Sequence, residues 1–377
     1  MKLVGVIDGE PFDPKLWSGS SRYLFEALQR RGVLHSALEA NPGSVESVFY
    51  QLLSFQPDMA RWKFKYHVHL GYYSAFTRKA RQALARIPET AYDLILQIGA
   101  WYDLTRYRGK PVVSYHDGNL AMLLKSPYGY PKIAARHTDA ALRYERELSS
   151  RIDLVFPMSR WLADSFVRDH GVSQRKVFPV GAGVNLPHIR PTADKDYTAP
   201  RILFVGIDFA RKGGPLLLEA FARVRREIPD AELTIIGPTL DDVPPGVRCL
   251  GPLSKANPDD VERLLDEYHR ASLFVMPSLY EPFGIVFGEA MAHRCPCIGT
   301  NICAMPEIID HGRTGFVVPP RDSAALARHM VTLLKDPALA REFGERGYQK
   351  YVADLTWDAV ARKMCDTMSG HLGVRPR

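Results

Sequence analysis

Two glutamates, Glu281 and Glu289, stand eight residues apart in the segment MPSLYEPFGIVFGEAMA, which covers residues 276–292. A short apolar run precedes the segment and has the composition of a buried strand. Residues 285–292 have the composition and periodicity of a helix. The pattern predicts a strand, a loop and a helix, with Glu281 in the loop and Glu289 on the helix.

Such a unit is suited to binding a nucleotide sugar. If the helix begins near Phe283 or Gly284, its unpaired N–H groups attract phosphate through their free donors and the helix dipole. Glu281 faces the same opening, and Glu289 lies between one and two turns along the helix. An anion between two polyhydroxyl groups is the pattern of a sugar, a diphosphate and a ribose. The alternative is structural: Glu281 as a helix-start carboxylate and Glu289 as a solvated helix residue.

The segment resembles the E-x7-E signature of retaining GT-B glycosyltransferases, family 4 in particular (glycosyl transferases group 1), including the E-P-F-G beginning. The resemblance implies that Glu281 orients the donor sugar by bonding its hydroxyls and that Glu289 holds the ribose. It also implies that the backbone N–H groups of Phe283, Gly284 and Ile285 bind the donor phosphates.

A basic loop, GIDFARKGG at residues 206–214, follows another apolar strand. It is neither a P-loop nor the dinucleotide G-x-G-x-x-G. The family commonly has Gly-Arg here and a Lys-Gly a few residues later. Lys212 matches the lysine, Ile207 replaces the arginine, and Arg211 is expected to supply the missing charge. The resemblance implies that Arg211 and Lys212 stabilise the departing phosphate, as fixed cations do. The structural alternative is a solvated basic turn.

Further positions match the family less closely. His116 stands directly after an apolar strand, where open α/β sheets place ligands, and resembles the family's acceptor-side histidine. Gly19, in Ser18-Gly19-Ser20, occupies the place of the family's glycine pair near the donor phosphates, while serine there also predicts a helix cap. The nucleotide base is expected on backbone and apolar groups of three residues, Pro238, Gly251 and Leu253.

Strands alternate with helices in both halves of the 377-residue chain, which predicts an α/β protein with two doubly wound parallel sheets. By resemblance this is the GT-B fold, two Rossmann-like domains facing across a cleft. The expected parts are an acceptor-binding domain, a proline-rich linker, a donor-binding domain and a C-terminal helix returning to the first domain: residues 1–185, 186–200, 201–355 and 356–377.

Composition narrows the class of protein and the metals or cofactors that the chain can be expected to bind. Hydrophobic residues at 46% and charged residues at 24% are typical of a soluble globular protein. Five cysteines predict buried thiols of a reducing compartment. A zinc site at His293, Cys295, Cys297 and Cys303 is disfavoured, because side chains alternate along a strand. Asp194-Lys195-Asp196 is a D-x-D in the linker, where a metal-binding pair is not expected. We therefore predict no metal and no cofactor apart from the nucleotide-diphosphate sugar.

The basic excess lies in the first half, where residues 1–185 hold 25 Lys and Arg against 17 Asp and Glu. Residues 61–86 hold seven basic and no acidic residues, interleaved with aromatics. This pattern suits a peripheral contact with an anionic membrane or an acidic acceptor. The alternative is a solvated basic helix pair whose aromatics pack inward. No nucleic-acid-binding module accompanies the patch.

The expected function is metal-independent, retaining transfer of a hexosyl unit to a glycan or lipid-linked acceptor in bacterial-type polysaccharide or glycolipid synthesis. The expected location is the cytoplasm, at the inner face of the membrane if the peripheral contact exists, since no leader pattern or apolar span is present in this sequence. The alternative is a catalytically silent GT-B protein that binds a glycan or nucleotide. A sugar-nucleotide epimerase and a glycogen-type phosphorylase are less favoured. A phosphorylase would need a lysine-bound pyridoxal phosphate, and nothing in the sequence marks that lysine.

Overall fold

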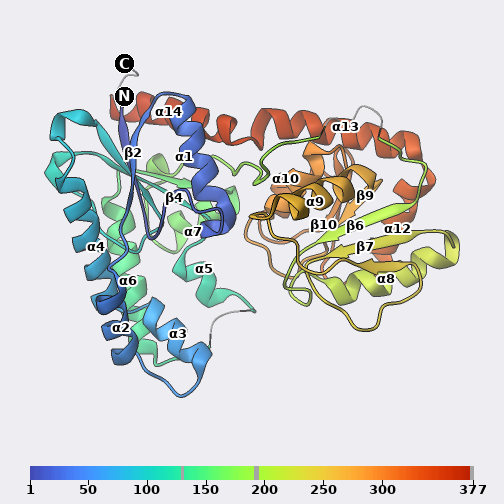
Figure 1. Cartoon of the computed structure of the whole chain (residues 1–377), viewed down its shortest axis with the longest axis horizontal. Helices are drawn as coiled ribbons and strands as arrows, with labels where there is room; N and C mark the ends of the chain where they lie inside the picture. The colour runs from blue at the N-terminus through green and yellow to red at the C-terminus, as the bar shows by residue number, and fades with distance from the viewer. Residues whose placement is uncertain (129–130, 191–194, 374–377) are drawn as a thin grey trace. The chain divides into compact units, whose positions relative to one another are not determined.

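A computed structural model describes residues 1–128, 131–190 and 195–373 of the chain. Strands and helices alternate along it (Figure 1), and the pairings between the named strands are parallel. The strands form two separate sheets. The α/β class with two parallel sheets is therefore confirmed.

The first sheet has five strands in the order β2-β1-β3-β4-β5. Its strands are β1 (Leu3–Ile7), β2 (Leu34–Glu39), β3 (Leu94–Ile98), β4 (Val112–His116) and β5 (Leu154–Pro157). All but β2 are buried throughout, because helices cover both faces of a parallel sheet and leave near-continuous apolar strands. The edge strand β2 was not predicted, since LHSALE contains no apolar run.

The helices of this region, in chain order, are α1 (Ser20–Arg30), α2 (Ser44–Leu53), α3 (Met59–His67), α4 (Leu70–Ala85), α5 (Leu120–Lys125), α6 (Ala135–Arg151) and α7 (Arg160–Arg168). Helices α2, α3 and α4 lie on the connection from β2 to β3. Four aromatic residues of α3 and α4 are buried against the sheet and its helices: Phe64, Tyr66, Tyr73 and Phe76. These rings belong to the core, as the structural alternative for residues 61–86 expected.

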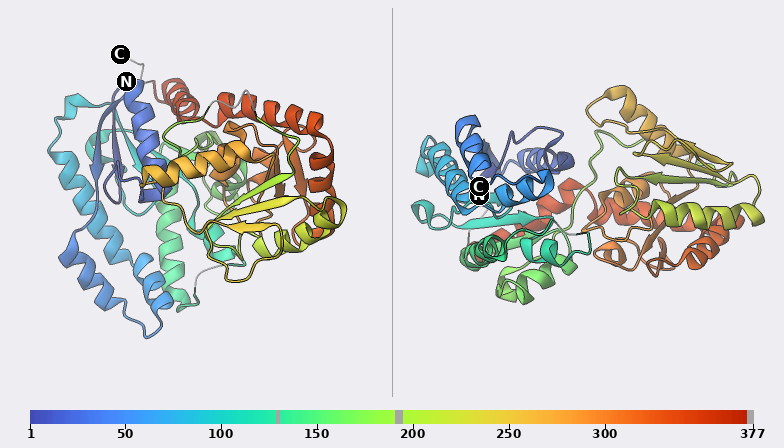
Figure 2. Two further views of the ribbon diagram at one scale, coloured as in Figure 1. Left: turned by 45° about the vertical axis from the view of Figure 1, so that its right-hand side comes forward. Right: turned by 90° about the horizontal axis from the view of Figure 1, so that it is seen from below.

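The second sheet has six strands in the order β11-β10-β9-β6-β7-β8. They are β6 (Arg201–Val205), β7 (Glu232–Ile236), β8 (Val247–Cys249), β9 (Leu273–Val275), β10 (Cys297–Thr300) and β11 (Gly315–Val318). The helices of this region are α8 (Gly214–Glu227), α9 (Pro258–Arg270), α10 (Ile285–Ala292), α11 (Met305–Ile308), α12 (Ser323–Lys335) and α13 (Pro337–Asp354). Helices α8 and α9 lie on opposite faces of this sheet (Figure 2).

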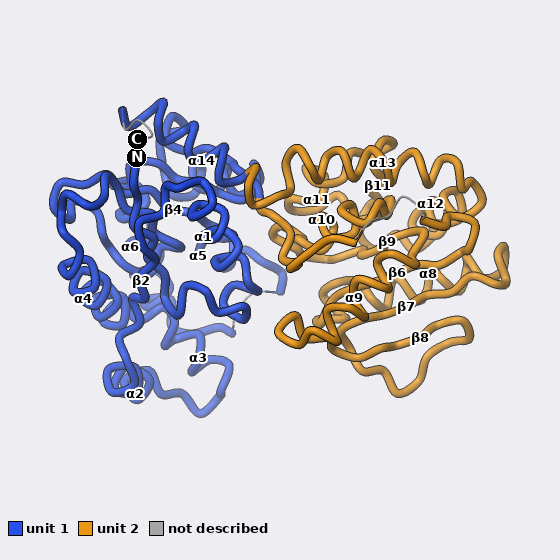
Figure 3. The backbone as a smooth tube through the Cα atoms, turned by 45° about the horizontal axis from the view of Figure 1, so that its top comes forward, with its two compact units in different colours: residues 1–181, 360–377 blue, residues 182–359 orange. Residues whose placement is uncertain are grey.

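The chain divides into two compact units, one of residues 1–181 and 360–377 and the other of residues 182–359 (Figure 3). Helix α14 (Trp357–Leu372) begins in the second unit and continues into the first. The described part of the predicted linker lies within the second unit, where Lys195 is buried and donates to the carbonyls of Tyr268 and His269. Asp194 of the D-x-D lies outside the described residues.

Candidate active site

The site residues predicted in the second unit lie at the carboxyl edge of its sheet. Strands β6 and β9 are neighbours in the middle of the sheet, and both run in the same direction. The loop after β6 carries Lys212, and the loop after β9 carries Glu281. Because the carboxyl ends of parallel strands meet at one edge, residues 69 positions apart in sequence come into contact.

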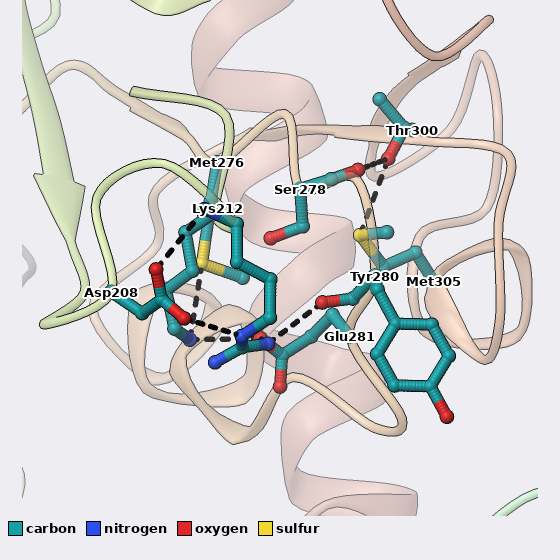
Figure 4. Close-up of polar contacts among 9 residues, drawn as sticks. Asp208, Lys212, Met276, Ser278, Tyr280, Glu281, Thr300 and Met305 are labelled. Atoms are coloured by element: carbon teal, nitrogen blue, oxygen red, sulfur yellow. Dashed lines mark hydrogen bonds and ion pairs between the residues drawn. The ribbon is translucent and has the colours of Figure 1, made fainter. Parts of the chain in front are cut away.

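Glu281 and Lys212 form an ion pair at the centre of this edge (Figure 4). Lys212 Nζ donates to Glu281 Oε2 at 2.8 Å, and the two side chains are 14% and 13% exposed. The lysine also lies 3.7 Å from Met276 Sδ. Both charges are thus largely desolvated yet open on one side, which strengthens their interaction with a ligand compared with the same charges in water.

Arg211 approaches the same carboxylate and is held by the loop around it. Its Nη1 atom lies 3.4 Å from Glu281 Oε2 and donates to the Tyr280 carbonyl at 2.7 Å. Its Nε atom donates to Asp208 Oδ2 at 3.0 Å. Burial raises the pKa of Asp208, but the backbone and side-chain hydrogen bonds from Arg211 outweigh it and lower the pKa overall. The guanidinium is therefore positioned beside Glu281.

Gly213 allows the two loops to approach. It has φ +76 and lies at the start of α8, and a Cβ atom there would come within 2.0 Å of the Pro277 carbonyl oxygen. Its Cβ-free backbone also adopts the left-handed conformation at little cost. The backbone of Leu279 donates to the Arg211 carbonyl at 2.8 Å and completes the junction.

Helix α10 begins where the E-P-F-G pattern predicted. Its N-cap is Gly284, with φ +83, and Ile285 is its first residue. Phe283 is buried beside it. The first N–H groups of a helix lack the usual partner within the helix. In α10 the N–H group of Phe287 donates to the Gly284 carbonyl at 3.0 Å, so the expected phosphate donors are the N–H groups before it, which follow Glu281 within a few residues.

Glu289 is wholly buried. The structural alternative, a solvated helix residue, is therefore wrong for this position. Lys255 Nζ bonds its Oε1 atom, and the Tyr268 hydroxyl donates to its Oε2 atom at 3.1 Å. Lys255 lies just after β8, and Tyr268 lies on α9. Burial, together with the neighbouring carboxylate, raises the pKa of Tyr268 well above its ordinary value, so the phenol keeps its proton and donates.

His293, one turn further along the chain, contacts the backbone of Glu289 and the ring of Tyr268. Its Nδ1 atom lies 2.8 Å from the Glu289 carbonyl oxygen, and its ring stacks on Tyr268 with centroids 5.3 Å apart. Burial lowers the pKa of His293 to about 4. No group of three or more metal-ligating side chains occurs among the described residues, including the His293 and cysteine set.

The residues predicted to bind the base lie on two joined loops. The Gly237 N–H, next to Pro238, donates to the Gly251 carbonyl at 2.9 Å. Pro238 and Leu253 are half-buried. These loops follow β7, which is next to β6, and β8, which is next to β7, on the side of β6 away from β9. The second loop leads into Lys255, whose contact with Glu289 connects the base loops to α10.

Ile207, which replaces the family's arginine, is 80% exposed. An isoleucine side chain carries no charge, whereas Arg211, four residues later, contacts Glu281 directly. This arrangement is consistent with the expected replacement.

In the first unit, His116 ends β4 and is 2% exposed. Its Nε2 atom lies 2.7 Å from Ser114 Oγ, and its ring packs on Phe166 at 4.8 Å. Burial, helped by His170, lowers the pKa of His116 to about 3. The imidazole is therefore neutral near pH 7, the form in which one ring nitrogen donates a hydrogen bond and the other accepts one.

Gly19 is the N-cap of α1, with φ +89, and it follows two further left-handed residues, Trp17 and Ser18. The N-cap makes no side-chain hydrogen bond. The predicted serine cap is therefore wrong, because the chain enters α1 through a glycine whose positive φ replaces the extended conformation of a serine cap.

Three residues of the site, Lys255, Tyr268 and Asp208, were not predicted from the sequence. Lys255 and Tyr268 carried no local signal, because each contacts Glu289 only through tertiary packing. Asp208 lies inside the basic loop GIDFARKGG, where a carboxylate three residues before an arginine was a detectable signal for a local ion pair.

Three comparisons place this arrangement among known proteins. Residues 199–336 match the family model described as "Glycosyl transferases group 1". The chain is 25% identical to the D-inositol 3-phosphate glycosyltransferase of Streptomyces avermitilis over 95% of its length and 84% of the relative. It is 29% identical to the glycogen synthase of Mycobacterium tuberculosis over 66% of each protein.

Solved structures share the fold across the whole chain. Sucrose-phosphate synthase from Thermosynechococcus elongatus superposes with a TM-score of 0.67 at 21% identity, covering 99% of this chain and 100% of the other. Anabaena HepE, solved in complex with UDP and glucose, superposes with a TM-score of 0.65 at 18% identity, covering 98% of this chain and 99% of the other.

Proposed function

We propose that the chain, whose residues 199–336 match the family model of the group 1 glycosyltransferases and which has the GT-B fold, transfers a hexosyl unit from a nucleoside-diphosphate sugar to a glycan or lipid-linked acceptor. The proposal includes retention of the anomeric configuration and independence of divalent metal, as in family 4. The observation that carries it is the convergence of Lys212 and Arg211 on Glu281, beside the start of α10.

The proposed chemistry follows from the charges at this site. Departure of a nucleoside diphosphate leaves negative charge on phosphate oxygens and positive charge at the anomeric carbon. Lys212 and Arg211, with the N–H groups at the start of α10, stabilise the phosphate, since fixed cations and donors act strongly where water is excluded. Glu281 accepts hydrogen bonds from the donor-sugar hydroxyls, and its bonds to Lys212 and Arg211 hold the three side chains in fixed relative positions.

Retention is proposed through attack by the acceptor on the face that the leaving group vacates, with a donor phosphate oxygen taking the acceptor proton. The C–O bond to the diphosphate breaks, the C–O bond to the acceptor forms, and the proton leaves with the diphosphate. Glu281 is not assigned as a covalent nucleophile, because its carboxylate is engaged by Lys212 and Arg211. His116 is proposed to hydrogen-bond sugar or acceptor as a neutral imidazole.

At the ribose, Glu289 is proposed to accept hydrogen bonds from the hydroxyls once Lys255 shifts. Both carboxylate oxygens already have partners, so a ribose must share or replace the lysine. The ammonium that leaves Glu289 is then available to a donor phosphate. Lys255 thereby links nucleotide binding to a change of partner at a buried carboxylate.

The partner of the first unit is proposed to be an anionic membrane surface, and α2 is the element that supports this most directly. Its apolar residues Val45, Val48, Phe49 and Leu52 repeat at helical spacing and are 51–85% exposed. Leu53, Phe55 and Met59 extend the same exposed surface at 54–59%. Contiguous exposed apolar residues of this size mark interaction sites.

Basic side chains border this apolar surface. Helix α3 lies against α2, since Trp62 Nε1 donates to the Gln51 carbonyl at 2.7 Å, and it carries the exposed Arg61 and Lys63. Charge next to an apolar helix face complements anionic headgroups above acyl chains. We therefore propose that the contact is made by α2 and α3, and not by the inward-packed aromatics. No helix in the described part of the chain is long and apolar enough to cross a bilayer.

The test of the catalytic proposal is a donor screen with the purified protein. UDP, GDP, ADP and their hexose derivatives are compared for thermal stabilisation, which increases with ligand concentration over Kd, and slow hydrolysis of the stabilising sugar nucleotide is then followed without acceptor. Stabilisation and hydrolysis that both disappear in Lys212→Ala support the enzyme. Binding with neither hydrolysis of the sugar nucleotide nor transfer to any acceptor tested would favour the catalytically silent alternative.

A further inference from the structure

Four arginines surround a surface hollow of about 440 Å³ on the first unit, apart from the residues discussed above. Arg81 comes from α4, Arg106 and Arg108 from the loop between β3 and β4, and Arg151 from the end of α6. The acidic residue in the lining is Asp103. Four positive charges and one negative charge give the lining a net charge of +3.

The carboxylate of Asp103 organises the hollow without neutralising it. Its Oδ1 atom accepts from the backbone and the hydroxyl of Thr105, at 2.9 and 2.6 Å. Its Oδ2 atom accepts from Arg151 Nη2 at 2.9 Å. Its carbonyl oxygen accepts from Arg81 Nη2 at 3.1 Å. Asp103 thus fixes the loop and two of the guanidinium groups.

The remaining charge has no acidic partner in the described part of the chain. Arg81 and Arg108 donate to carbonyl oxygens, those of Asp103 and Ile87, which leave their positive charge uncompensated. The ion pair within the lining joins Arg151 to Asp103 and does not involve Arg106. Guanidinium groups with unused N–H donors in a concave site are suited to binding oxyanions through paired hydrogen bonds.

Two of these arginines have a strained backbone conformation. Arg106 has φ +64 and Arg108 has φ +50, both in the left-handed region. A non-glycine residue in that region costs about 1 kcal/mol or more, and glycine or asparagine would adopt it more easily. Strained residues of this kind occur most often at binding and catalytic sites.

The hollow is distinct from the edge of the sheet that carries His116. The loop with Arg106 and Arg108 leads into the amino end of β4, whereas His116 ends the same strand. Arg151 likewise comes just before the amino end of β5. The arginines therefore lie at the opposite edge of the sheet from the proposed acceptor histidine.

We propose that this hollow is a binding site for a small soluble phosphate compound, a diphosphate or a phosphate ester, separate from the donor site. The volume is within the range of small-molecule sites, and three uncompensated guanidinium groups match a ligand with two or more negative charges. Asp103 and Thr105 act as positioning residues for the arginines. The proposal does not depend on the glycosyl-transfer function.

The experiment is isothermal titration with inorganic pyrophosphate, glucose 1-phosphate and inorganic phosphate in the full-length Lys212→Ala protein, so that the donor site contributes little. Pyrophosphate is expected to bind with the highest affinity, and more weakly as salt increases. Arg106→Gln/Arg108→Gln is expected to raise its Kd at least tenfold, since each lost charged hydrogen bond costs about 1.5 kcal/mol or more. Arg106→Lys/Arg108→Lys should have an intermediate effect.

The matched control is Arg223→Gln/Arg226→Gln on α8, which removes the same charge from exposed positions of the second unit. It should leave the Kd unchanged. An equal loss of affinity in both double variants, or no pyrophosphate binding at millimolar concentration, would overturn the proposal. A lipid source of phosphate is tested with phosphatidylglycerol vesicles. If Arg106→Gln/Arg108→Gln lost vesicle binding but kept pyrophosphate binding, the site would not be one for soluble phosphates.

Discussion

Lys255 Nζ bonds the carboxylate of Glu289, although the two residues are 34 positions apart and Glu289 has no exposed surface. Removing one partner of a buried ion pair is costly, because the other charge remains desolvated. Since Lys255 is 32% exposed, solvent can reach its side of the pair. The ion pair therefore combines a structural role with a proposed role in ribose binding.

For this pair, Lys255→Met is expected to destabilise the second unit by about 2 kcal/mol, and Lys255→Met/Glu289→Gln by less. Urea unfolding of the wild type, Lys255→Met, Glu289→Gln and the double variant measures the coupling free energy between the two side chains.

Glu289→Ala alone should mainly weaken donor binding, with a higher KM for the sugar nucleotide. A lower kcat with unchanged donor affinity would contradict the ribose assignment.

At the centre of the site, Glu281→Ala and Lys212→Ala are each expected to reduce kcat by about a hundredfold or more, the effect of losing one electrostatic stabiliser. Arg226→Gln, an exposed arginine of α8, serves as a control for charge and should retain activity. Turnover is measured with the donor found in the nucleotide screen. Near-normal turnover in both folded variants would refute this placement of the active site.

Metal dependence is tested by chelation. Because Lys212 and Arg211 are positioned to neutralise the leaving diphosphate, transfer in excess EDTA should equal transfer in untreated enzyme. Addition of Mg²⁺ or Mn²⁺ should change the rate less than twofold, compared with the same concentration of NaCl corrected for ionic strength. Loss of activity in EDTA with full recovery on Mg²⁺ would contradict the proposed mechanism.

The buried histidines predict how stability depends on pH. The pKa of His116 is lowered to about 3 and that of His293 to about 4, whereas an unfolded histidine titrates near 6.5. Below about pH 6.5 the unfolded chain therefore binds protons that the folded chain does not. The stabilisation is complete above that pH and is lost as the pH falls toward 4 and then 3.

The change amounts to about 1.4 kcal/mol per pH unit for each such histidine between those pKa values. His116→Gln should lessen the slope of unfolding free energy against pH between pH 6 and 4.5, measured in urea. His188, which is 51% exposed, offers the control substitution His188→Gln. An unchanged slope in the His116 variant would show that this histidine is protonated in the folded protein.

Membrane contact is tested on α2 by cosedimentation with neutral and anionic vesicles. Phe49→Ser/Leu52→Ser should weaken binding to anionic vesicles by about tenfold or more, since each buried apolar side chain contributes about 1.5 kcal/mol or more. Val352→Ser, on α13, removes an apolar side chain that is 52% exposed and should have no effect. Equal, negligible binding to both vesicle types would leave a soluble saccharide as the better acceptor.

Local sequence was sufficient where one segment carries the whole signal. The buried strands of parallel sheets are apolar runs, so β1, β3, β4, β6 and β9 were predictable. The Gly284 start of α10 was predictable too, because E-P-F-G combines a turn with a residue tolerant of positive φ. Resemblance in two loops then predicted both members of the Glu281–Lys212 pair, without any contact between them being visible.

Tertiary structure decided which residues share a carboxylate and which face of a helix is covered. Lys255 and Tyr268 bond Glu289 only because β8, α9 and α10 pack together, and no periodicity encodes that distance. The aromatics of residues 61–86 and the apolar side chains of α2 look alike in sequence. Packing buries four of the former (Phe64, Tyr66, Tyr73 and Phe76) and leaves Phe49 and Leu52 exposed, because burial depends on which surfaces the fold brings together.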